Sequence, residues 1–285
     1  MSYKGQTAFL TGGASGIGRA VTKMLVEKGI RVYVADRDLK GAQAVAEELN
    51  TGGKAVWTVQ VDVADWDSQR GAWETAEAEF KRIDYVFPVA GIGERRSFPN
   101  RPNSAGYEKP DLTVLEVDCI GVIYTVSLAV QHFRRQQPNK YGFRGKIMPV
   151  ASVCGFYIHQ PIPIYTAAKH AVVGLVRSYG KILAEEKITL NAVCPNKIRT
   201  GISTAAVYDK AEKLGVLVPM EKLLEAFESL LGENPMSGEC LEVAPKLGVR
   251  VVQFVPFINE ESKISADMTY ERSHYLHEPI MDDRT

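Results

Sequence analysis

The chain has no excess of charge of either sign. Lys and Arg number 34, Asp and Glu also number 34, and the formal net charge of the 285 residues is +0 at pH 7. A protein that binds nucleic acid or an anionic membrane surface normally carries a basic excess. The composition therefore gives no support for a nucleic-acid or membrane partner, and we expect a small-molecule substrate.

Paired metal-ligating residues are also scarce. The four cysteines are Cys119, Cys154, Cys194 and Cys240. None of them forms a C-x-x-C pair, which argues against a zinc knuckle and against a redox dithiol. The histidines offer one suggestive pair, His274 and His277, which alone is a weak indication of a metal. We expect no metal site and four reduced, mostly buried thiols.

Targeting signals are missing from the amino terminus. Met1 to Lys4 lead directly into an apolar strand-like segment, without the basic flank, long apolar run or cleavage site of a signal peptide. We also expect no apolar span of about eighteen residues, the length that crosses a membrane. The sequence therefore favours a cytoplasmic protein.

Short apolar runs alternate with helical patterns along most of the chain. Strands are predicted at 7–10, 31–35, 55–61, 85–89, 146–150, 189–194 and 240–243. Helices are predicted before Gly29 and at 39–49, 66–80, 112–136, 164–186 and 222–231. This alternation predicts an α/β, doubly wound Rossmann fold, with a seven-stranded parallel sheet and helices on both faces.

We expect the 285 residues to form a single dinucleotide-binding catalytic domain, a common size for an α/β fold. The predicted core runs from about 5 to 243, and 244–285 is a C-terminal extension without a recognisable pattern. The irregular stretches 94–111 and 201–221 are candidate binding loops. The second of these begins a predicted substrate lid at about 201–235.

A glycine-rich turn, Thr11-Gly-Gly-Ala-Ser-Gly-Ile-Gly18, joins the first strand to the first helix. Bare backbone N–H groups and a helix N-terminus at this place can receive a pyrophosphate. A side chain would obstruct the turn at Gly12, the dinucleotide at Gly16 and the helix–strand contact at Gly18. The residues expected to bind the cofactor here are Gly12, Ser15, Gly16, Ile17 and Gly18. A glycine turn without a ligand is the alternative.

Asp36 ends the second strand, eighteen residues after Gly18. A carboxylate there can accept hydrogen bonds from the adenosine ribose and repel a 2′-phosphate, which favours NAD. Arg37 leaves NADP open, because a guanidinium suits a 2′-phosphate. Helix capping is the other interpretation of Asp36. Asp62 and Val63, after the third strand, are placed to meet the adenine.

Tyr165 and Lys169 lie four residues apart on a predicted helix and therefore share one face. An adjacent ammonium favours the phenolate, so Tyr165 can exchange a proton with an alcohol or carbonyl oxygen. Ser152, thirteen residues before Tyr165, can polarise the same oxygen. Of the twelve tyrosines, Tyr165 alone has a lysine four residues later, although a chance match remains the alternative.

Six motifs in order resemble the single-domain branch of the short-chain dehydrogenase/reductases, over about residues 5–243. They are Thr11 to Gly18, Asp62-Val63, Ala90-Gly91, Ser152, Tyr165-x-x-x-Lys169 and Asn191-Ala-Val-Cys-Pro195. Asp36 and the segment 117–125 are most similar to the 15-hydroxyprostaglandin-dehydrogenase-like subgroup and to members from fungal secondary metabolism.

The resemblance implies a nicotinamide cofactor, NAD more than NADP, bound also by Ala90 and Gly91. It implies that Pro195, Ile198 and Thr200 flank the nicotinamide carboxamide. It further implies a homodimer or homotetramer formed by the two long helices.

Three positions depart from the family pattern. Asp118 replaces the usual Asn of the fourth helix; its backbone carbonyl still suits the proton relay, and its charge is expected to act on Lys169. Pro88-Val89 replaces Asn-Asn, which removes bracing side chains and one backbone donor. Asn196 replaces a glycine, and asparagine tolerates the positive φ of such a turn.

The sequence thus predicts hydride transfer between NAD(H) and a secondary alcohol or ketone, with Ser152, Tyr165, Lys169 and Asp118 as the catalytic group. Two alternatives stay open. One is a non-catalytic nucleotide-binding protein of the same fold, and the other is a cyclase or isomerase that uses the same pocket.

Overall fold

The computed structural model describes residues 3–95, 98 and 106–277. The chain divides into two compact units, Met1–Val251 and Val252–Thr285. A six-stranded parallel sheet with the order β3-β2-β1-β4-β5-β6 forms the centre of the first unit. Its strands are β1 (Thr7–Thr11), β2 (Arg31–Asp36), β3 (Val56–Gln60), β4 (Tyr85–Pro88), β5 (Gly145–Ile147) and β6 (Ile188–Leu190). The strand order reverses between β1 and β4, where doubly wound sheets bind ligands at the carboxyl ends of the strands.

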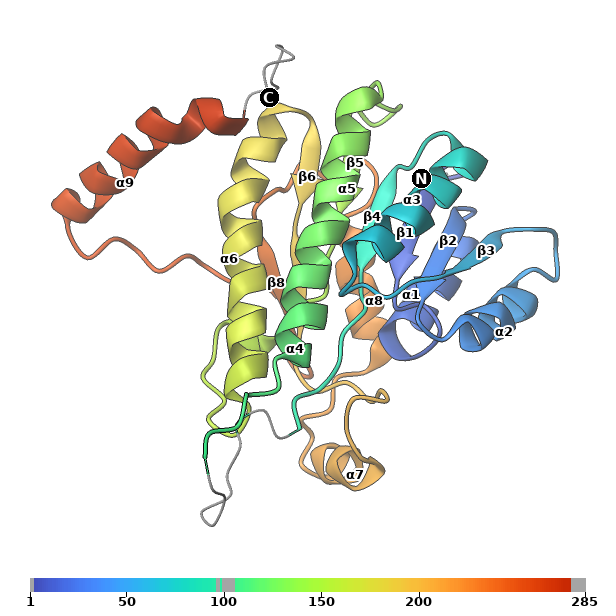
Figure 1. Cartoon of the computed structure of the whole chain (residues 1–285), viewed down its shortest axis with the longest axis horizontal. Helices are drawn as coiled ribbons and strands as arrows, with labels where there is room; N and C mark the ends of the chain where they lie inside the picture. Colours follow the sequence, from blue (N-terminus) through green and yellow to red (C-terminus); the bar gives the residue numbers. More distant parts are fainter. Residues whose placement is uncertain (1–2, 96–97, 99–105, 278–285) are drawn as a thin grey trace. The chain divides into compact units, whose positions relative to one another are not determined.

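Helices cover both faces of this sheet (Figure 1). One face carries α1 (Gly16–Glu27), α2 (Leu39–Leu49) and α8 (Met220–Ser229). The other face carries α3 (Trp66–Phe80), α5 (Gly121–Arg135) and α6 (Pro163–Glu185). Each face has its own apolar core: Leu25 and Phe227 belong to the first, Trp73, Phe133 and Val176 to the second. The predicted doubly wound α/β fold is confirmed.

The predicted strand 189–194 is divided in two, so the count of seven strands in the sheet is wrong. After β6, Asn191 intervenes, and β7 (Ala192–Pro195) pairs with β8 (Cys240–Ala244). The Asn191 side chain donates to the Met236 carbonyl at 2.6 Å and accepts from the Glu239 N–H at 3.0 Å. These bonds draw the chain toward β8. A three-stranded sheet β7-β8-β9 results, in which β9 (Gly248–Val251) is antiparallel and was not predicted.

The predicted helix 112–136 is three segments: α4 (Thr113–Leu115), a π-helical turn η1 (Glu116–Ile120) and α5. Together Thr113–Arg135 are long and apolar enough to cross a membrane, with a mean hydropathy of 1.7, which contradicts the expectation that no such span exists. The protein itself covers most of the window, 61% of which is buried. A helix that is apolar on most sides is also what a core position beside α3 and α6 requires.

The irregular segment 201–221 contains a further helix, α7 (Ala205–Lys213). A short 3₁₀ helix, η2 (Val153–Gly155), follows β5. In the second unit, α9 (Glu260–Ser273) and η3 (His274–His277) are described, and no residue of α9 is buried.

Two departures from the family pattern are accommodated locally. Pro88 is the last residue of β4 and keeps the regular register opposite Thr11. The Thr11 hydroxyl accepts from the N–H groups of Val89 at 3.2 Å and Ala90 at 3.4 Å, and these bonds brace the end of β4 against β1. Asn196 does not adopt a positive φ; its side chain instead donates to Glu242 at 2.8 Å.

Candidate active site

The glycine turn between β1 and α1 is packed too closely against backbone atoms for side chains at Gly12 and Gly18. A Cβ at Gly12, whose φ is +79°, would lie 2.6 Å from the Cα and N atoms of Ala90. A Cβ at Gly18 would lie 2.0 Å from the carbonyl oxygen of Gly12. Ser15 is the N-cap of α1 and makes no side-chain bond to its first turn. The first N–H groups of α1 therefore have no acceptor from the cap, which suits a bound phosphate.

The segment after β7 lies against this turn. A Cβ at Gly16 would be 3.4 Å from the Cβ and Cγ2 atoms of Thr200. The Thr200 hydroxyl is 3.1 Å from the hydroxyl of Tyr208 in α7, which ties the segment to that helix. Pro195 ends β7, and Ile198 is buried. The structure thus places the residues expected at the nicotinamide along one segment that reaches the glycine turn.

Asp36 is oriented by the turn itself. One carboxylate oxygen accepts from the Ala14 N–H at 2.9 Å, and the other accepts from the Asp38 N–H at 2.9 Å. The capping interpretation of Asp36 is wrong, because Asp38 is the N-cap of α2 and accepts from Gly41 at 3.0 Å. Arg37 is exposed. The Asp36 carboxylate is therefore held beside the glycine turn, where an adenosine ribose would lie.

Asp62 and Val63 follow β3 with different exposures. Asp62 is exposed, and its carboxylate accepts from the Ala64 N–H at 3.0 Å. Val63 is buried against Gly121, at which a Cβ would be 2.9 Å from the Val63 carbonyl oxygen. The Gln69 side chain holds this contact, because its amide donates to the carbonyl of Val63 at 2.7 Å and to the carbonyl of Gly121 at 2.8 Å. Val63 thus has a packing role, and Asp62 presents a polar group at the sheet edge.

Ser152 and Tyr165 are brought together from η2 and α6. Ser152 is the N-cap of η2 and accepts from the Cys154 N–H at 3.1 Å. Burial raises the pKa of Tyr165 above its usual value. The Lys169 ammonium and a hydrogen bond from Ser152 act to lower that pKa, while Asp118 and Cys154 add to the rise.

Lys169 lies one helical turn from Tyr165, with Nζ 5.4 Å from the centroid of the phenol ring. Its Nζ is 2.9 Å from Oδ2 of Asp118 and donates to the Val150 carbonyl at 3.2 Å. Both partners of the ion pair are buried, with side-chain exposures of 4% and 0%. The other Asp118 oxygen accepts from the Ile92 N–H at 2.8 Å. An ammonium has three donors, so one N–H of Lys169 is left for another acceptor.

Ala90 and Gly91 pack between the glycine turn and the Asp118–Lys169 ion pair. Gly12 meets the backbone of Ala90, and a Cβ at Gly91 would lie 3.0 Å from Oδ2 of Asp118. The segment after β4 therefore connects the glycine turn to the Asp118–Lys169 pair.

Glu94 was not singled out from the sequence. Its carboxylate accepts from the backbone N–H of Tyr165 at 2.7 Å and so caps the first turn of α6. The available signal was its place three residues after Gly91, at the start of a predicted binding loop. Half of that loop, residues 96–97 and 99–105, lies outside the described residues.

These features fit a dinucleotide. The turn offers N–H donors to phosphates, Asp36 offers acceptors to ribose hydroxyls, and Lys169 retains one donor near the phenol. Among the described residues, no cluster of three or more His, Cys, Asp or Glu side chains is arranged to hold a metal.

Comparison with known proteins gives one consistent result. The sequence pattern of the short chain dehydrogenase family matches residues 6–211. The chain is similar to the short-chain dehydrogenase/reductase ATR7 of Stachybotrys chlorohalonatus, with 31% identity over 75% of this chain and 64% of that protein, less than two thirds of its length. It is 34% identical to the short-chain dehydrogenase anuF of Penicillium roqueforti, over 78% of this chain and 85% of that protein.

A solved structure has a similar fold. The 3-ketoacyl-(acyl-carrier-protein) reductase from Brucella melitensis, complexed with NADH, matches with a TM-score of 0.72 and 25% identity. The match covers 86% of this chain and 99% of that one.

Proposed function

The chain belongs to the short-chain dehydrogenase family, and from that premise we propose that it interconverts a secondary alcohol and a ketone with NAD(H) as cofactor. The observation that carries this proposal is the meeting of Ser152, Tyr165 and Lys169 at the carboxyl ends of the strands, next to the glycine turn. The fungal relatives ATR7 and anuF support a role in fungal secondary metabolism.

In this proposal Tyr165 exchanges a proton with the substrate oxygen. The Ser152 hydroxyl donates to the same oxygen and polarises it. The remaining N–H of Lys169 would hold a ribose hydroxyl of the bound cofactor. The bound nicotinamide supplies or accepts the hydride at the carbon that bears this oxygen.

The preference for NAD rests on Asp36. Its carboxylate is fixed beside the turn by Ala14 and Asp38, so a 2′-phosphate on the ribose would meet a negative charge. Arg37 is exposed and belongs to the same connection, which leaves some affinity for NADP. The NADH-bound reductase of Brucella melitensis is consistent with a nicotinamide cofactor.

The function is tested by mixing the protein with NAD or NADP and a panel of secondary alcohols and ketones, and following the absorbance of the reduced nicotinamide. Replacing Tyr165 by Phe removes the proton donor, and we expect kcat/KM to fall by about 10²- to 10⁴-fold. Tyr33→Phe, which removes a phenolic hydroxyl from β2, is the matched control and should keep its rate. Equal rates in the Tyr165 variant and the native protein would refute the proposed role.

The same assay separates the other two functions. Tight cofactor binding without turnover across the panel would indicate a non-catalytic nucleotide-binding protein. Product formation without net change in the cofactor would indicate a cyclase or isomerase.

We extend the proposal to a homodimer or homotetramer. A groove between α5 and α6 has a mixed lining of apolar side chains, among them Ile123 and Leu175, and polar side chains, among them Gln131, Arg134 and Tyr179. Ile123 is 38% exposed, and covering such a face is the usual reason for self-association. The solution mass of the protein measures this directly.

A further inference from the structure

A buried ion pair lies beside the phenol of Tyr165: Lys169 is one helical turn along α6, and Asp118 contacts Lys169 from η1. We infer that Asp118 is a positioning residue that keeps both protons on the Tyr165–Lys169 pair, so that Tyr165 meets its substrate as a phenol ready to protonate a carbonyl oxygen. This inference rests on the proposed function and narrows its direction to the reduction of the ketone.

The geometry of the ion pair carries the argument. Nζ of Lys169 lies 2.9 Å from Oδ2 of Asp118, in ion-pair contact, and 5.4 Å from the centroid of the Tyr165 ring. Both charged side chains are buried, so their attraction is screened much less than at the surface. A lysine whose charge is already compensated offers less stabilisation to a phenolate. The proton of Tyr165 is therefore held more tightly than a lone neighbouring ammonium would allow.

The other groups around Tyr165 and Lys169 do not replace the effect of Asp118 on the proton of Tyr165. The groups that face Tyr165 are Lys169 from α6, Asp118 from η1, Ser152 and Cys154 from η2, and Glu94, which accepts from its backbone N–H. Those that face Lys169 also include Cys119 and Cys194, whose thiol pKa values are raised by burial. The set thus contains one basic side chain, Lys169, and two carboxyl side chains, Asp118 and Glu94.

The directions of the pKa shifts agree with the geometry. Burial raises the pKa of Tyr165, and the carboxylate of Asp118 raises it further against the opposing ammonium. Burial alone would lower the pKa of Lys169, but Asp118 and Tyr165 together raise it above its usual value. Tyr165 and Lys169 are thus both held in their protonated forms.

The proton balance then favours one direction of reaction. In reduction, the carbonyl oxygen takes the proton of Tyr165 as the carbonyl carbon takes a hydride, and the C=O bond becomes a C–OH group. The phenolate that remains regains its proton from solvent. In oxidation, the pair must lose a proton before the alcohol binds, which requires a higher pH. We therefore expect reduction to persist into alkaline conditions and oxidation to begin there.

The test follows the ionisation of Tyr165 without any turnover. The cofactor-free protein is labelled with ¹³Cζ-tyrosine and titrated by NMR, and the Tyr165 signal is assigned by its loss in Tyr165→Phe. In the native protein we expect this signal to stay in the phenol form beyond about pH 8. In Asp118→Asn the first deprotonation of the coupled pair should move down by at least about one pH unit, which is a tenfold change in its equilibrium constant. The acidic limb of the pH profile of kcat/KM for alcohol oxidation should shift by the same amount.

Glu186→Gln is the matched control, because it also removes a carboxylate from an ion pair between α5 and α6, with Arg134 at 2.6 Å, but at the far end of α6. It should leave the Tyr165 titration unchanged. If Asp118→Asn does not fold, Asp118→Ser removes the same charge with a smaller side chain, and circular dichroism verifies the fold of either variant. An unchanged titration in the charge-removed protein, or a native Tyr165 that ionises below about pH 8, would overturn the inference. A panel without turnover would instead count against the proposed function, while the NMR titration would still decide the role of Asp118.

Discussion

Lys146 and Lys169 are both buried, with exposed fractions of 2% and 3%, but among the described residues only Lys169 forms an ion pair with a carboxylate. Lys146, in β5, contacts the ring of Phe143 at 3.8 Å and the carbonyl of Asn234. Burial lowers its pKa to about 8. Lys169 gains an ion pair with Asp118, which outweighs the effect of burial and raises its pKa. Burial thus lowers the pKa of one lysine, and a carboxylate partner reverses the direction of the shift at the other.

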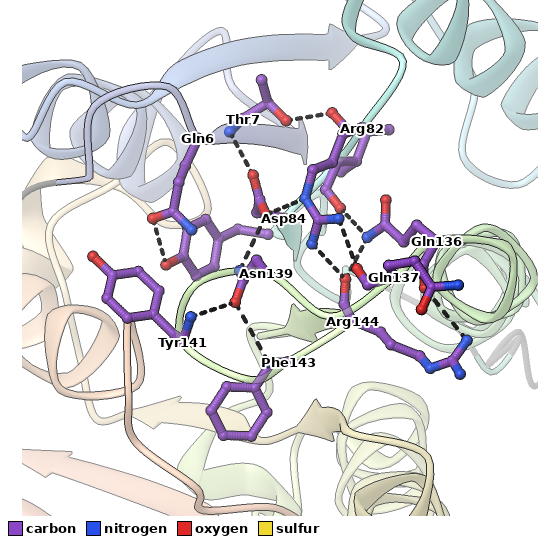
Figure 2. A network of polar contacts seen from close by, with 12 residues as sticks. Gln6, Thr7, Arg82, Asp84, Gln136, Gln137, Asn139, Tyr141, Phe143 and Arg144 are labelled. Carbon is purple, nitrogen blue, oxygen red and sulfur yellow. Dashed lines mark hydrogen bonds and ion pairs between the residues drawn. The ribbon is translucent and has the colours of Figure 1, made fainter.

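The two ends of the sheet also use buried carboxylates differently. Just before β4, Asp84 accepts from Arg82 at 2.7 Å, from the Thr7 N–H at 3.1 Å and from Asn139 at 3.1 Å (Figure 2). The Arg82 side chain is 33% exposed, so its charge is still solvated. These bonds join β1 to segments distant in sequence. Asp118, in contrast, shares its burial with the cation that it neutralises, and it does so beside a reactive phenol.

The largest expected effect on stability comes from removing the ammonium of Lys169 from its ion pair with Asp118. Lys169→Met leaves Asp118 buried with the Ile92 N–H and without its ammonium. We expect the free energy of unfolding to fall by about 3–5 kcal/mol, as for other buried pairs that lose one partner. Urea unfolding followed by circular dichroism at neutral pH measures this loss.

A second substitution in the same background shows whether the ion pair is the cause. Adding Asp118→Asn removes the unpaired charge, so the double variant should regain most of the lost stability. If the stability losses of Lys169→Met and Asp118→Asn simply add in the double variant, the two charges do not stabilise one another. The contrast between Lys169 and Lys146 would then be wrong.

A smaller effect is expected at the amino end of the sheet. Asp84→Asn keeps the shape of the side chain but weakens charge-assisted bonds to Arg82 and the Thr7 N–H. We expect a loss of about 2–3 kcal/mol of stability, because hydrogen bonds to charged groups contribute about 1.5–3 kcal/mol. The four residues of β4 separate Asp84 from the site, so the affinity for NAD, measured by calorimetry on folded protein, should not change. A tenfold weaker affinity would show that the two ends are coupled.

Local spacing is what made much of this structure predictable. The strand–turn–helix pattern placed the glycine turn at the end of β1, and the i, i+4 spacing placed Tyr165 and Lys169 on one face of α6. The resemblance to a family led us to expect that the charge of Asp118 acts on Lys169, and the structure places the two 2.9 Å apart.

Features that depend on contacts between distant segments were missed. The division of one predicted strand at Asn191 follows from its bonds to Met236 and Glu239, more than forty residues away. The cap that Glu94 provides to α6 joins residues 71 positions apart. The π-helical turn at Glu116–Ile120 has no periodicity that separates it from an α-helix over so few residues. Periodicity reports which face of an element is apolar and does not report which distant polar group meets it.

The smallest expected effect is a dependence of stability on pH that is caused by Lys146 and tests its contrast with Lys169. The folded-state pKa of Lys146, about 8, lies below the usual value of 10.5, so between these values the unfolded chain binds more protons than the folded one. Stability should therefore rise with pH through that window. Relative to Lys146→Met, which removes the titrating group, we expect the native protein to gain about 1 kcal/mol between about pH 7 and 9. Urea unfolding of both proteins across that range measures the difference, in which the titrations of tyrosines and cysteines cancel. A flat difference would show that water or a local rearrangement keeps Lys146 charged, so that burial without a carboxylate is not enough to favour loss of its proton.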